Sequence, residues 1–192
     1  MEMKYAVVVG AAGGMGKECV ATLMTEGWHV FGLDIRQIEP DTRAHHNGAG
    51  ALTPLHCDIS DSASVEKAFV QIAEHTDRVN ALICCSGILR VGPLATMTNE
   101  AFDSIFAVNV RGPWLCAKAA VPFLERASQS AYPSRLIFLS SVAAFRPKLD
   151  GGAYSATKVA LENITRAFAG ELASKGILVN AVAPGPVDTP FI

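Results

Sequence analysis

Short, almost wholly apolar runs alternate along the chain with longer segments that have helical periodicity. Six runs rich in β-branched and apolar residues span residues 4–9, 28–33, 51–57, 79–85, 135–140 and 177–183. Apolar side chains three to four positions apart, the spacing of an amphipathic helix, mark residues 17–26, 61–75, 98–127 and 151–175. Pro113 lies within the third of these segments, so we expect two helices or one bent helix there, with the break around Asn109 and Gly112.

The apolar runs are continuous rather than alternating, as in strands that are buried on both faces. Strands that alternate with helices in this way are typical of a parallel sheet with helices on both faces. We therefore predict an α/β fold, with residues 1–192 forming a single doubly wound (Rossmann) domain of six strands. For the polar residues 37–50 we expect a short helix or a loop.

Composition excludes several classes of function. The formal net charge of −2 at pH 7 gives no basic surface for a nucleic acid or a membrane. No apolar run approaches the ~18 residues of a membrane span, and no leader is visible, so we expect a cytoplasmic protein. The five cysteines are odd in number and lack metal-ligand spacing, which predicts free thiols and no metal site. The pairs His45–His46 and His56–Cys57 resemble metal ligands only in isolation.

Ligands of doubly wound sheets bind beyond the carboxyl ends of the strands. The first strand ends in a turn with glycines at 10, 13, 14 and 16, where the backbone can approach a pyrophosphate and a helix N-terminus can face the anion. Asp34 closes the second strand and is placed to accept hydrogen bonds from a ribose diol. A carboxylate there repels a 2′-phosphate and favours NAD over NADP, although Arg36 weakens this preference.

Tyr154 and Lys158 are four residues apart in the last helical segment and so share one helix face. A phenol beside an ammonium group is a candidate acid with a lowered pKa, which suits proton transfer near neutral pH. An ordinary amphipathic helix with an exposed lysine would have the same spacing. The pair therefore carries weight only together with the other motifs.

Taken in order, these motifs resemble the short-chain dehydrogenase/reductase family over essentially the whole chain. The family's glycine motif corresponds to Gly10, Gly14 and Gly16. Its acidic residue after the third strand corresponds to Asp58, and its Asn-Val-x-Gly motif begins at Asn109. Its catalytic serine lies thirteen residues before the tyrosine, which selects Ser141 over Ser140. The Tyr-x-x-x-Lys motif is Tyr154 and Lys158, and the Pro-Gly motif after the sixth strand is Pro184-Gly185.

The resemblance implies an NAD(H)-dependent oxidoreductase that interconverts a secondary alcohol and a ketone. Tyr154 would act as general acid/base, and Ser141 would hold the substrate oxygen. Lys158 would hold the nicotinamide ribose and lower the pKa of Tyr154, and Asn109 would anchor a water of a proton relay. The expected NAD-binding residues are Gly10, Gly14, Met15, Gly16, Asp34, Asp58, Ile59, Ser86, Gly87, Tyr154, Lys158, Pro184, Gly185, Val187 and Thr189.

The substrate should be a small molecule in a mostly apolar pocket. Its expected lining residues are Ser86, Ile88, Leu89, Arg90, Val142, Ala143, Phe145 and Pro186, with Arg90 either a carboxylate contact or exposed to solvent. The resemblance also implies a homo-oligomer, commonly a tetramer, with one interface formed by the helices around residues 100–125 and 154–174. The alternatives are a non-catalytic dinucleotide-binding protein, acting as a sensor or scaffold, and an epimerase or dehydratase with tightly held NAD.

The sequence departs from the family pattern at the sheet centre and at its end. Val9 stands where a threonine is usual, and Cys84-Cys85-Ser86-Gly87 replaces Asn-Asn-Ala-Gly. Both changes remove polar side chains, which suggests apolar packing in place of a polar tether. Family members are usually longer. Because this sequence ends at Ile192, we expect a partial chain without the seventh strand and the C-terminal substrate-covering region; the alternative is a naturally shortened member with an open pocket.

Overall fold

A computed structural model describes residues 3–39, 50–128 and 132–189 of the chain. Most of the segment expected to be a short helix or loop, residues 40–49, lies outside the described residues, and so do His45 and His46.

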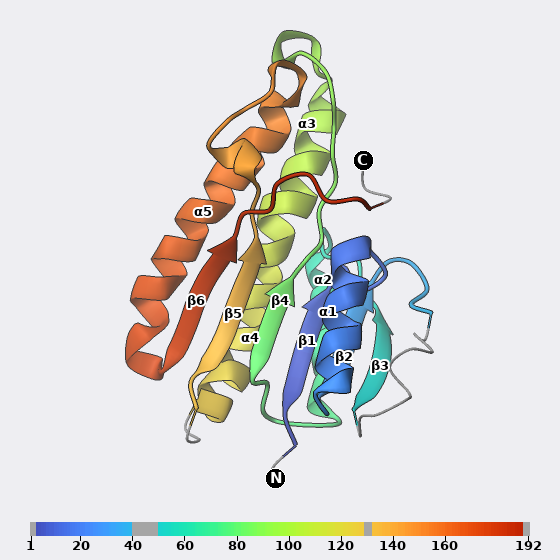
Figure 1. Ribbon diagram of the computed structural model, residues 1–192, viewed down its shortest axis with the longest axis vertical. Coiled ribbons are helices and arrows are strands. Elements are labelled where there is room, and N and C mark those ends of the chain that lie inside the picture. Colours follow the sequence, from blue (N-terminus) through green and yellow to red (C-terminus); the bar gives the residue numbers. More distant parts are fainter. Residues whose placement is uncertain (1–2, 40–49, 129–131, 190–192) are drawn as a thin grey trace.

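Six parallel strands form the central sheet, in the order β3-β2-β1-β4-β5-β6 (Figure 1). They are β1 (Tyr5–Val9), β2 (His29–Asp34), β3 (Ala51–His56), β4 (Ala81–Cys84), β5 (Ser134–Leu139) and β6 (Ile177–Val182). All six predicted strands are confirmed. The strand order reverses where β1 lies beside β4, with Val9 in register with Cys84.

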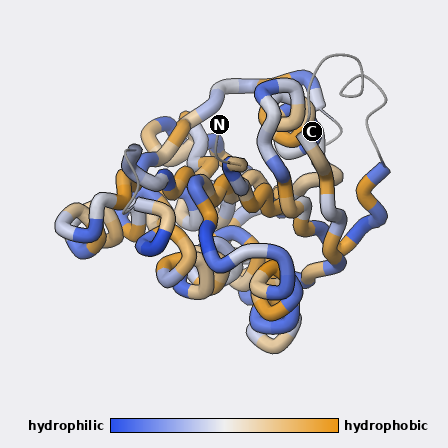
Figure 2. Tube along the Cα trace, turned by 90° about the horizontal axis from the view of Figure 1, so that it is seen from below, coloured by the Kyte–Doolittle hydropathy of each residue, from blue (hydrophilic) through white to orange (hydrophobic). Residues whose placement is uncertain are grey.

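Helices cover both faces of the sheet, as predicted (Figure 1). They are α1 (Gly14–Thr25), α2 (Ser62–Ala73), α3 (Asn99–Phe106), α4 (Gly112–Ser128) and α5 (Gly152–Leu172). Buried residues of α2, α4 and α5 form the larger apolar cluster with one face of the sheet. Residues of α1 form a smaller cluster with the other face. Hydrophobic and hydrophilic residues are interspersed along the chain trace in Figure 2, as amphipathic elements require.

Burial on both faces holds for the central strands but not for β6. Val7 and Val9 of β1 belong to the larger cluster and Val8 to the smaller one, and all three side chains are fully buried. In β6, Leu178 and Val182 are exposed although their neighbour Val179 is buried. A continuous apolar run therefore overstated the burial of this outer strand, whose neighbour lies on one side only.

Local caps set two of the helix ends. The Asp61 carboxylate accepts hydrogen bonds from the backbone amides of Ala63 (3.1 Å) and Ser64 (3.2 Å) at the start of α2. Such a residue satisfies amides that have no partner within the helix. Gly27 follows α1 with φ of 81° and donates to the Met24 carbonyl (3.0 Å), the geometry of a glycine C-cap.

The expected break near Asn109 is a π-helical segment, η3 (Ala107–Arg111), which connects α3 to α4. A wider turn placed just before Pro113 accommodates a residue that has no amide hydrogen and whose ring crowds the preceding turn. The helical segment that runs from α3 through η3 to α4 is therefore continuous. It has a wider turn at Asn109 and does not separate into two helices. A second proline, Pro122, lies inside α4 and was not anticipated as an interior helix residue.

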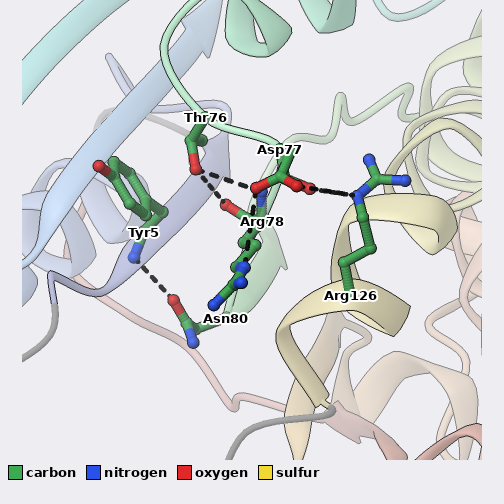
Figure 3. A network of polar contacts seen from close by, with 6 residues as sticks. All are labelled: Tyr5, Thr76, Asp77, Arg78, Asn80 and Arg126. Carbon is green, nitrogen blue, oxygen red and sulfur yellow. Dashed lines mark hydrogen bonds and ion pairs between the residues drawn. The ribbon is translucent and has the colours of Figure 1, made fainter.

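A polar network closes the amino end of the sheet (Figure 3). The Asn80 side chain accepts from the Tyr5 amide (2.9 Å), which ties the start of β1 to the segment before β4. Arg126 of α4 donates to the Asp77 backbone carbonyl (2.6 Å) and forms a longer ion pair with its carboxylate (3.9 Å). Because these side chains are largely exposed, the ion pair contributes little to stability. The carboxyl end of the sheet, in contrast, opens into a cavity.

We predict that Gly16→Ala destabilises the protein by about 1–3 kcal/mol, the usual cost of overpacking. A Cβ on Gly16 would lie 2.1 Å from the Gly10 carbonyl oxygen, and that backbone cannot move without disrupting the turn. Gly170→Ala is the matched control, because a Cβ there meets no atom within 4 Å. The control should be stabilising by about 0.5–1 kcal/mol. Urea unfolding measures both, and equal stabilities for the two variants would contradict the packing argument.

Candidate functional site

A cavity of about 460 Å³ opens at the carboxyl end of the sheet, around the point where β1 and β4 separate. Its volume is in the range of small-molecule sites. Twelve of the predicted site residues line it: Gly10, Gly14, Met15, Gly16, Asp34, Asp58, Ile59, Ser86, Gly87, Tyr154, Lys158 and Thr189. Segments far apart in the sequence therefore meet at one edge, because parallel strands end there together.

The glycine turn is tight because other backbone occupies the space beside it. Gly10 has φ of 79°, and a Cβ on it would lie 2.7 Å from the Ser86 nitrogen. Gly13 precedes α1 without any side-chain cap, so the first amides of the helix depend on another partner. Because Gly14 and Gly16 line the cavity, this uncapped helix N-terminus is suited to an anion such as a pyrophosphate.

Asp34 is buried at the end of β2 and forms a close pair with Arg36. One carboxylate oxygen accepts from the Arg36 amide (3.0 Å) and Nε (3.1 Å), and the other accepts from the Ala12 amide (3.0 Å) and Arg36 Nη2 (3.2 Å). Burial opposes ionisation, but these hydrogen bonds outweigh it and hold the pKa of Asp34 below its usual value. A carboxylate has about four acceptor positions. A ribose diol therefore competes with Arg36 for this carboxylate.

Asp58 is also engaged locally. Its Oδ1 accepts from the Ser60 amide (2.9 Å) and hydroxyl (2.7 Å). The next residue, Ile59, lines the cavity and packs against Gly112 at the start of α4, where an added Cβ would lie 2.6 Å from the Ile59 side chain. Ile59 thus gives the cavity an apolar wall, and Asp58 adds a polar group to the same lining as Asp34.

Two buried hydroxyl groups line the cavity without a hydrogen-bond partner in the described part of the chain. They belong to Ser86, after β4, and Ser140, after β5. An unpartnered buried hydroxyl costs free energy, so both groups are suited to a polar ligand. Ser86 was predicted, whereas Ser140 was set aside in favour of Ser141. The signal for Ser140 was its position directly after a buried strand.

Tyr154 lines the cavity, and Ser141 lies beside it. The Ser141 side chain hydrogen-bonds the Tyr154 hydroxyl, and its oxygen also accepts from the Ala143 amide (3.1 Å). Burial raises the pKa of Tyr154, and the Ser141 hydrogen bond opposes this only in part. The expected lowering of the Tyr154 pKa is therefore wrong for the protein by itself. The desolvation of the phenolate outweighs the help that its neighbours give.

Lys158 lies beside Tyr154, with its Nζ 5.5 Å from the centroid of the phenol ring. Only 3% of Lys158 is exposed, and Nζ donates to the Leu139 carbonyl (2.6 Å). Burial lowers the pKa of Lys158 to about 8, against the opposing influence of Cys85 and Cys84. An ammonium group has three donors. Since Lys158 also lines the cavity, it can hold a ligand oxygen while it remains anchored to β5.

Asn109 is fully buried in η3 and does not line the cavity. Its Oδ1 accepts from the Ile88 amide (2.8 Å), and its Nδ2 donates to the Ile88 carbonyl (2.9 Å) and to the Thr157 hydroxyl (3.2 Å). Both amide hydrogens are thus used within the protein. The side chain fixes the segment after β4 against α5, so it is a positioning group.

Four other predicted site residues lie outside the cavity lining: Ser141, Pro184, Gly185 and Val187. The Pro184 carbonyl accepts from the Val142 amide (3.0 Å), which ties the segments after β5 and β6 together. Thr189 returns to cover Gly14, where an added Cβ would lie 2.5 Å from its methyl group.

Half of the predicted substrate pocket lies in the cavity wall. Ser86, Ile88, Leu89 and Arg90 line it, whereas Val142, Ala143, Phe145 and Pro186 do not. Arg90 is exposed, and its guanidinium donates to its neighbour's carbonyl. The prediction did not include Ala12, Ile35 and Val108, which also line the cavity. They are apolar residues without a motif. Ala12 and Ile35 could have been indicated only by their place after strand ends, and Val108 only by its place beside Asn109 in η3.

The fold and the cavity together define a nucleotide-binding α/β protein of the Rossmann type. The uncapped helix, the close glycine turn and the two unpartnered hydroxyls fit a dinucleotide along the strand ends. More specifically, the chain belongs to the short-chain dehydrogenase family of oxidoreductases, since the family model described as short chain dehydrogenase matches residues 4–192.

Individual relatives agree with this assignment. An uncharacterized oxidoreductase, YxbG, from Bacillus subtilis is 32% identical over 100% of this chain and 70% of its own length. The 2-dehydro-3-deoxy-L-rhamnonate dehydrogenase (NAD(+)) of a Sphingomonas species is 30% identical over 98% of this chain and 74% of its own. The crystal structure of 3-ketoacyl-(acyl-carrier-protein) reductase from Brucella melitensis, complexed with NADH, matches with a TM-score of 0.86 and 27% identity, over 99% of this chain and 78% of that one.

None of the helices in the described ranges is both long and apolar enough to cross a bilayer. Within the same ranges, no three His, Cys, Asp or Glu side chains gather in a way that would hold a metal ion.

We predict that the charge on Lys158 makes stability depend on pH. The folded-state pKa of about 8 lies below the ordinary value of 10.5, so between these values the unfolded chain binds more protons. The protein should therefore gain stability as pH rises from about 8 to about 10.5, relative to a Lys158→Met variant. Urea unfolding at several pH values measures the difference. A constant difference would show that Lys158 is not desolvated.

Proposed function

We propose that the protein is an NAD(H)-dependent oxidoreductase that interconverts a secondary alcohol and a ketone, with Tyr154 as general acid/base. The observation that carries this proposal is that Tyr154 and Lys158 line the same cavity as the glycine turn, while Ser141 hydrogen-bonds Tyr154 from just outside the cavity lining. A phenol, a hydroxyl and a cation around one point suit chemistry at a carbonyl oxygen. We assign residues 1–192 to a single NAD-binding domain on the same grounds.

In the reductive direction, the Tyr154 hydroxyl donates its proton to the carbonyl oxygen of the ketone. Its raised pKa keeps the phenol protonated at neutral pH, so the acid is present in the form that this direction needs. Ser141, hydrogen-bonded to Tyr154, holds the same substrate oxygen and limits its position. The bound nicotinamide supplies the hydride donor or acceptor. In the oxidative direction Tyr154 takes the proton from the alcohol, and a nearby positive charge favours the phenolate this requires.

Lys158 and Asn109 have supporting roles in this proposal. Lys158 stabilises the phenolate electrostatically and donates to the nicotinamide ribose while the Leu139 carbonyl holds its Nζ. Asn109 keeps the Ile88 segment in place through two hydrogen bonds to its backbone. Because both Nδ2 hydrogens are committed, the water expected at Asn109 would be held by a backbone carbonyl of η3.

The preference for NAD over NADP rests on Asp34. A buried carboxylate with a lowered pKa is ionised at neutral pH and repels a 2′-phosphate. Arg36 neutralises part of that charge and fills acceptor positions that the ribose diol would use. The relative from Sphingomonas is named as an NAD(+) enzyme, which supports the same preference.

The family resemblance and one surface feature support a homo-oligomer. A shallow hollow on the outer side of α3, η3, α4 and α5 is lined by Asp103, Phe106, Ala107, Val110, Arg111, Trp114 and Ile164. Trp114 and the neighbouring Phe102 are large apolar side chains that are exposed. An apolar surface on these long helices suits contact with a second copy of the chain.

Replacing Tyr154 by Phe should lower kcat by about 10²–10⁴-fold, the usual contribution of general acid–base catalysis. NADH oxidation is followed with a panel of ketones, and NADH binding is followed by fluorescence. Binding should stay within about twofold of the unaltered protein, since the phenol ring is kept. Tyr132→Phe, at an exposed tyrosine, is the matched control and should retain full turnover.

Three outcomes of this assay lead to different conclusions. Full turnover by Tyr154→Phe would reject the mechanism. NADH binding by the unaltered protein without turnover of any ketone would favour a dinucleotide sensor or scaffold. Substrate conversion without net NADH consumption would favour an epimerase or dehydratase.

The Asp34–Arg36 pair predicts opposite effects on cofactor choice. Arg36→Ala frees acceptor positions on the carboxylate and should raise the ratio of NADH to NADPH affinity by roughly tenfold. Asp34→Ser removes the repulsion and should lower that ratio by roughly tenfold. Titration of each variant with both cofactors measures the ratio. Arg135→Ala is the control: it removes an arginine whose Nη1 donates to the nearby Pro133 carbonyl, and it should leave the affinity ratio unchanged. A shift of the ratio in the same direction in Arg36→Ala and Asp34→Ser would contradict the argument.

A further inference from the structure

Two cysteines lie together at the cavity, one in its lining and one behind it, and the proposed mechanism uses neither of them. Cys19 is on α1 and Cys85 follows β4, and their sulfur atoms are 4.0 Å apart. Both side chains are partly buried and pack against the apolar cluster on the α1 side of the sheet. The neighbouring Cys84 faces the other side and is fully buried in the larger cluster. Strand alternation thus separates the adjacent thiols and gives Cys85 a partner on α1.

The environment of the pair makes Cys19 the reactive thiol. The Cys85 S–H group donates toward the Cys19 sulfur, which lowers the pKa of Cys19 to about 7, although burial and Glu18 oppose this. Burial raises the pKa of the other described thiols outside the pair, to about 11 for Cys57 and about 12 for Cys84. The thiolate is the form that attacks an oxidant.

We propose that peroxide converts Cys19 and Cys85 into a reversible disulfide, and that this modification weakens dinucleotide binding at the adjacent cavity. The second part rests on the proposed function. The Cys19 thiolate attacks one peroxide oxygen, the O–O bond breaks, and a sulfenic acid and hydroxide form. The hydroxide takes up the proton that Cys19 released on ionising and leaves as one water. Cys85 then attacks the Cys19 sulfur, the S–O bond breaks, and a second water leaves. Two thiols are oxidised, one hydrogen peroxide is reduced, and the atoms balance.

The disulfide would act on the cavity through the elements that carry the two cysteines. An S–S bond of about 2.05 Å requires the sulfurs to approach from their present separation. Cys85 has little freedom to move, because its amide donates to the Val9 carbonyl (2.8 Å) and its carbonyl carbon would lie 3.1 Å from a Cβ on Gly10. The movement therefore falls mainly on α1, whose N-terminus faces the cavity. Shifting this helix moves the amides that suit the pyrophosphate.

The test begins with reduced protein that is treated with hydrogen peroxide, alkylated and mapped by mass spectrometry. We expect a peptide that links Cys19 to Cys85, has lost two hydrogens and is restored by dithiothreitol. NADH affinity, measured by fluorescence titration, should fall by about tenfold on oxidation, a typical coupling between sites. Cys19→Ser should bind NADH like the reduced protein and be insensitive to peroxide. Cys116→Ala, which removes a free thiol of α4 that lies outside both the pair and the cavity lining, should behave like the unaltered protein.

Other outcomes would overturn the proposal. They are recovery of Cys19 only as a sulfinic or sulfonic acid, a link between other cysteines, or a Cys19–Cys85 link with unchanged NADH affinity. Cys85→Ser is a second variant, in which peroxide should leave Cys19 as a sulfenic acid that a dimedone probe traps; an unlabelled Cys19 there would reject its role as the attacking thiol. The mapping does not depend on NADH. If the reduced protein fails to bind NADH, the proposed function and the regulatory consequence are rejected, and the mapping still decides the modification site.

Discussion

The direct pairing of β1 with β4 is the contact on which the site depends. Chain connections leave the sheet in opposite directions from these two strands, so a gap opens beyond their carboxyl ends. Only glycine fits at the end of β1, because a Cβ on Gly10 would lie 2.7 Å from the Ser86 backbone nitrogen and would push the two strand ends apart. The glycine turn, Asp34, Ser86 and Lys158 line one cavity. They come together there because the cavity forms where β1 lies beside β4.

Around the cavity, polar groups are buried at a cost that packing elsewhere sustains. Keeping Lys158 charged at a pKa of about 8 in place of 10.5 corresponds to a penalty on the order of 3 kcal/mol. The hydroxyls of Ser86 and Ser140 are buried without partners in the described chain, and each such group adds to the cost. The two apolar clusters behind the site stabilise the sheet enough to hold these groups in place. Groups held in unfavourable surroundings are typical of functional sites.

The replacement of polar residues by cysteine at the end of β4 changes what this part of the sheet can do. Val9 and Cys84 are register neighbours and are both buried in the larger cluster, in agreement with apolar packing in place of a polar tether. Cys85, on the other face, meets Cys19 of α1. A position that elsewhere in the family holds an asparagine therefore brings a thiol to the boundary between the glycine helix and the cavity.

Most of the fold could be predicted from the sequence because its determinants are local. Apolar runs indicated all six strands, and helical periodicity indicated the segments that form the helices. Motif spacing also indicated twelve residues of the cavity wall. Other features depended on which groups meet in the folded chain. They include the exposed face of β6 and the unbroken helical segment from α3 through η3 to α4. They also include the ion pair between Arg36 and Asp34 and the hydrogen bonds between Asn109 and Ile88. The direction of the Tyr154 pKa was wrong from sequence because spacing shows that Lys158 is near but not how much water both groups lose. Desolvation and pairing between remote segments arise only when the strands assemble, and tertiary structure alone decides them.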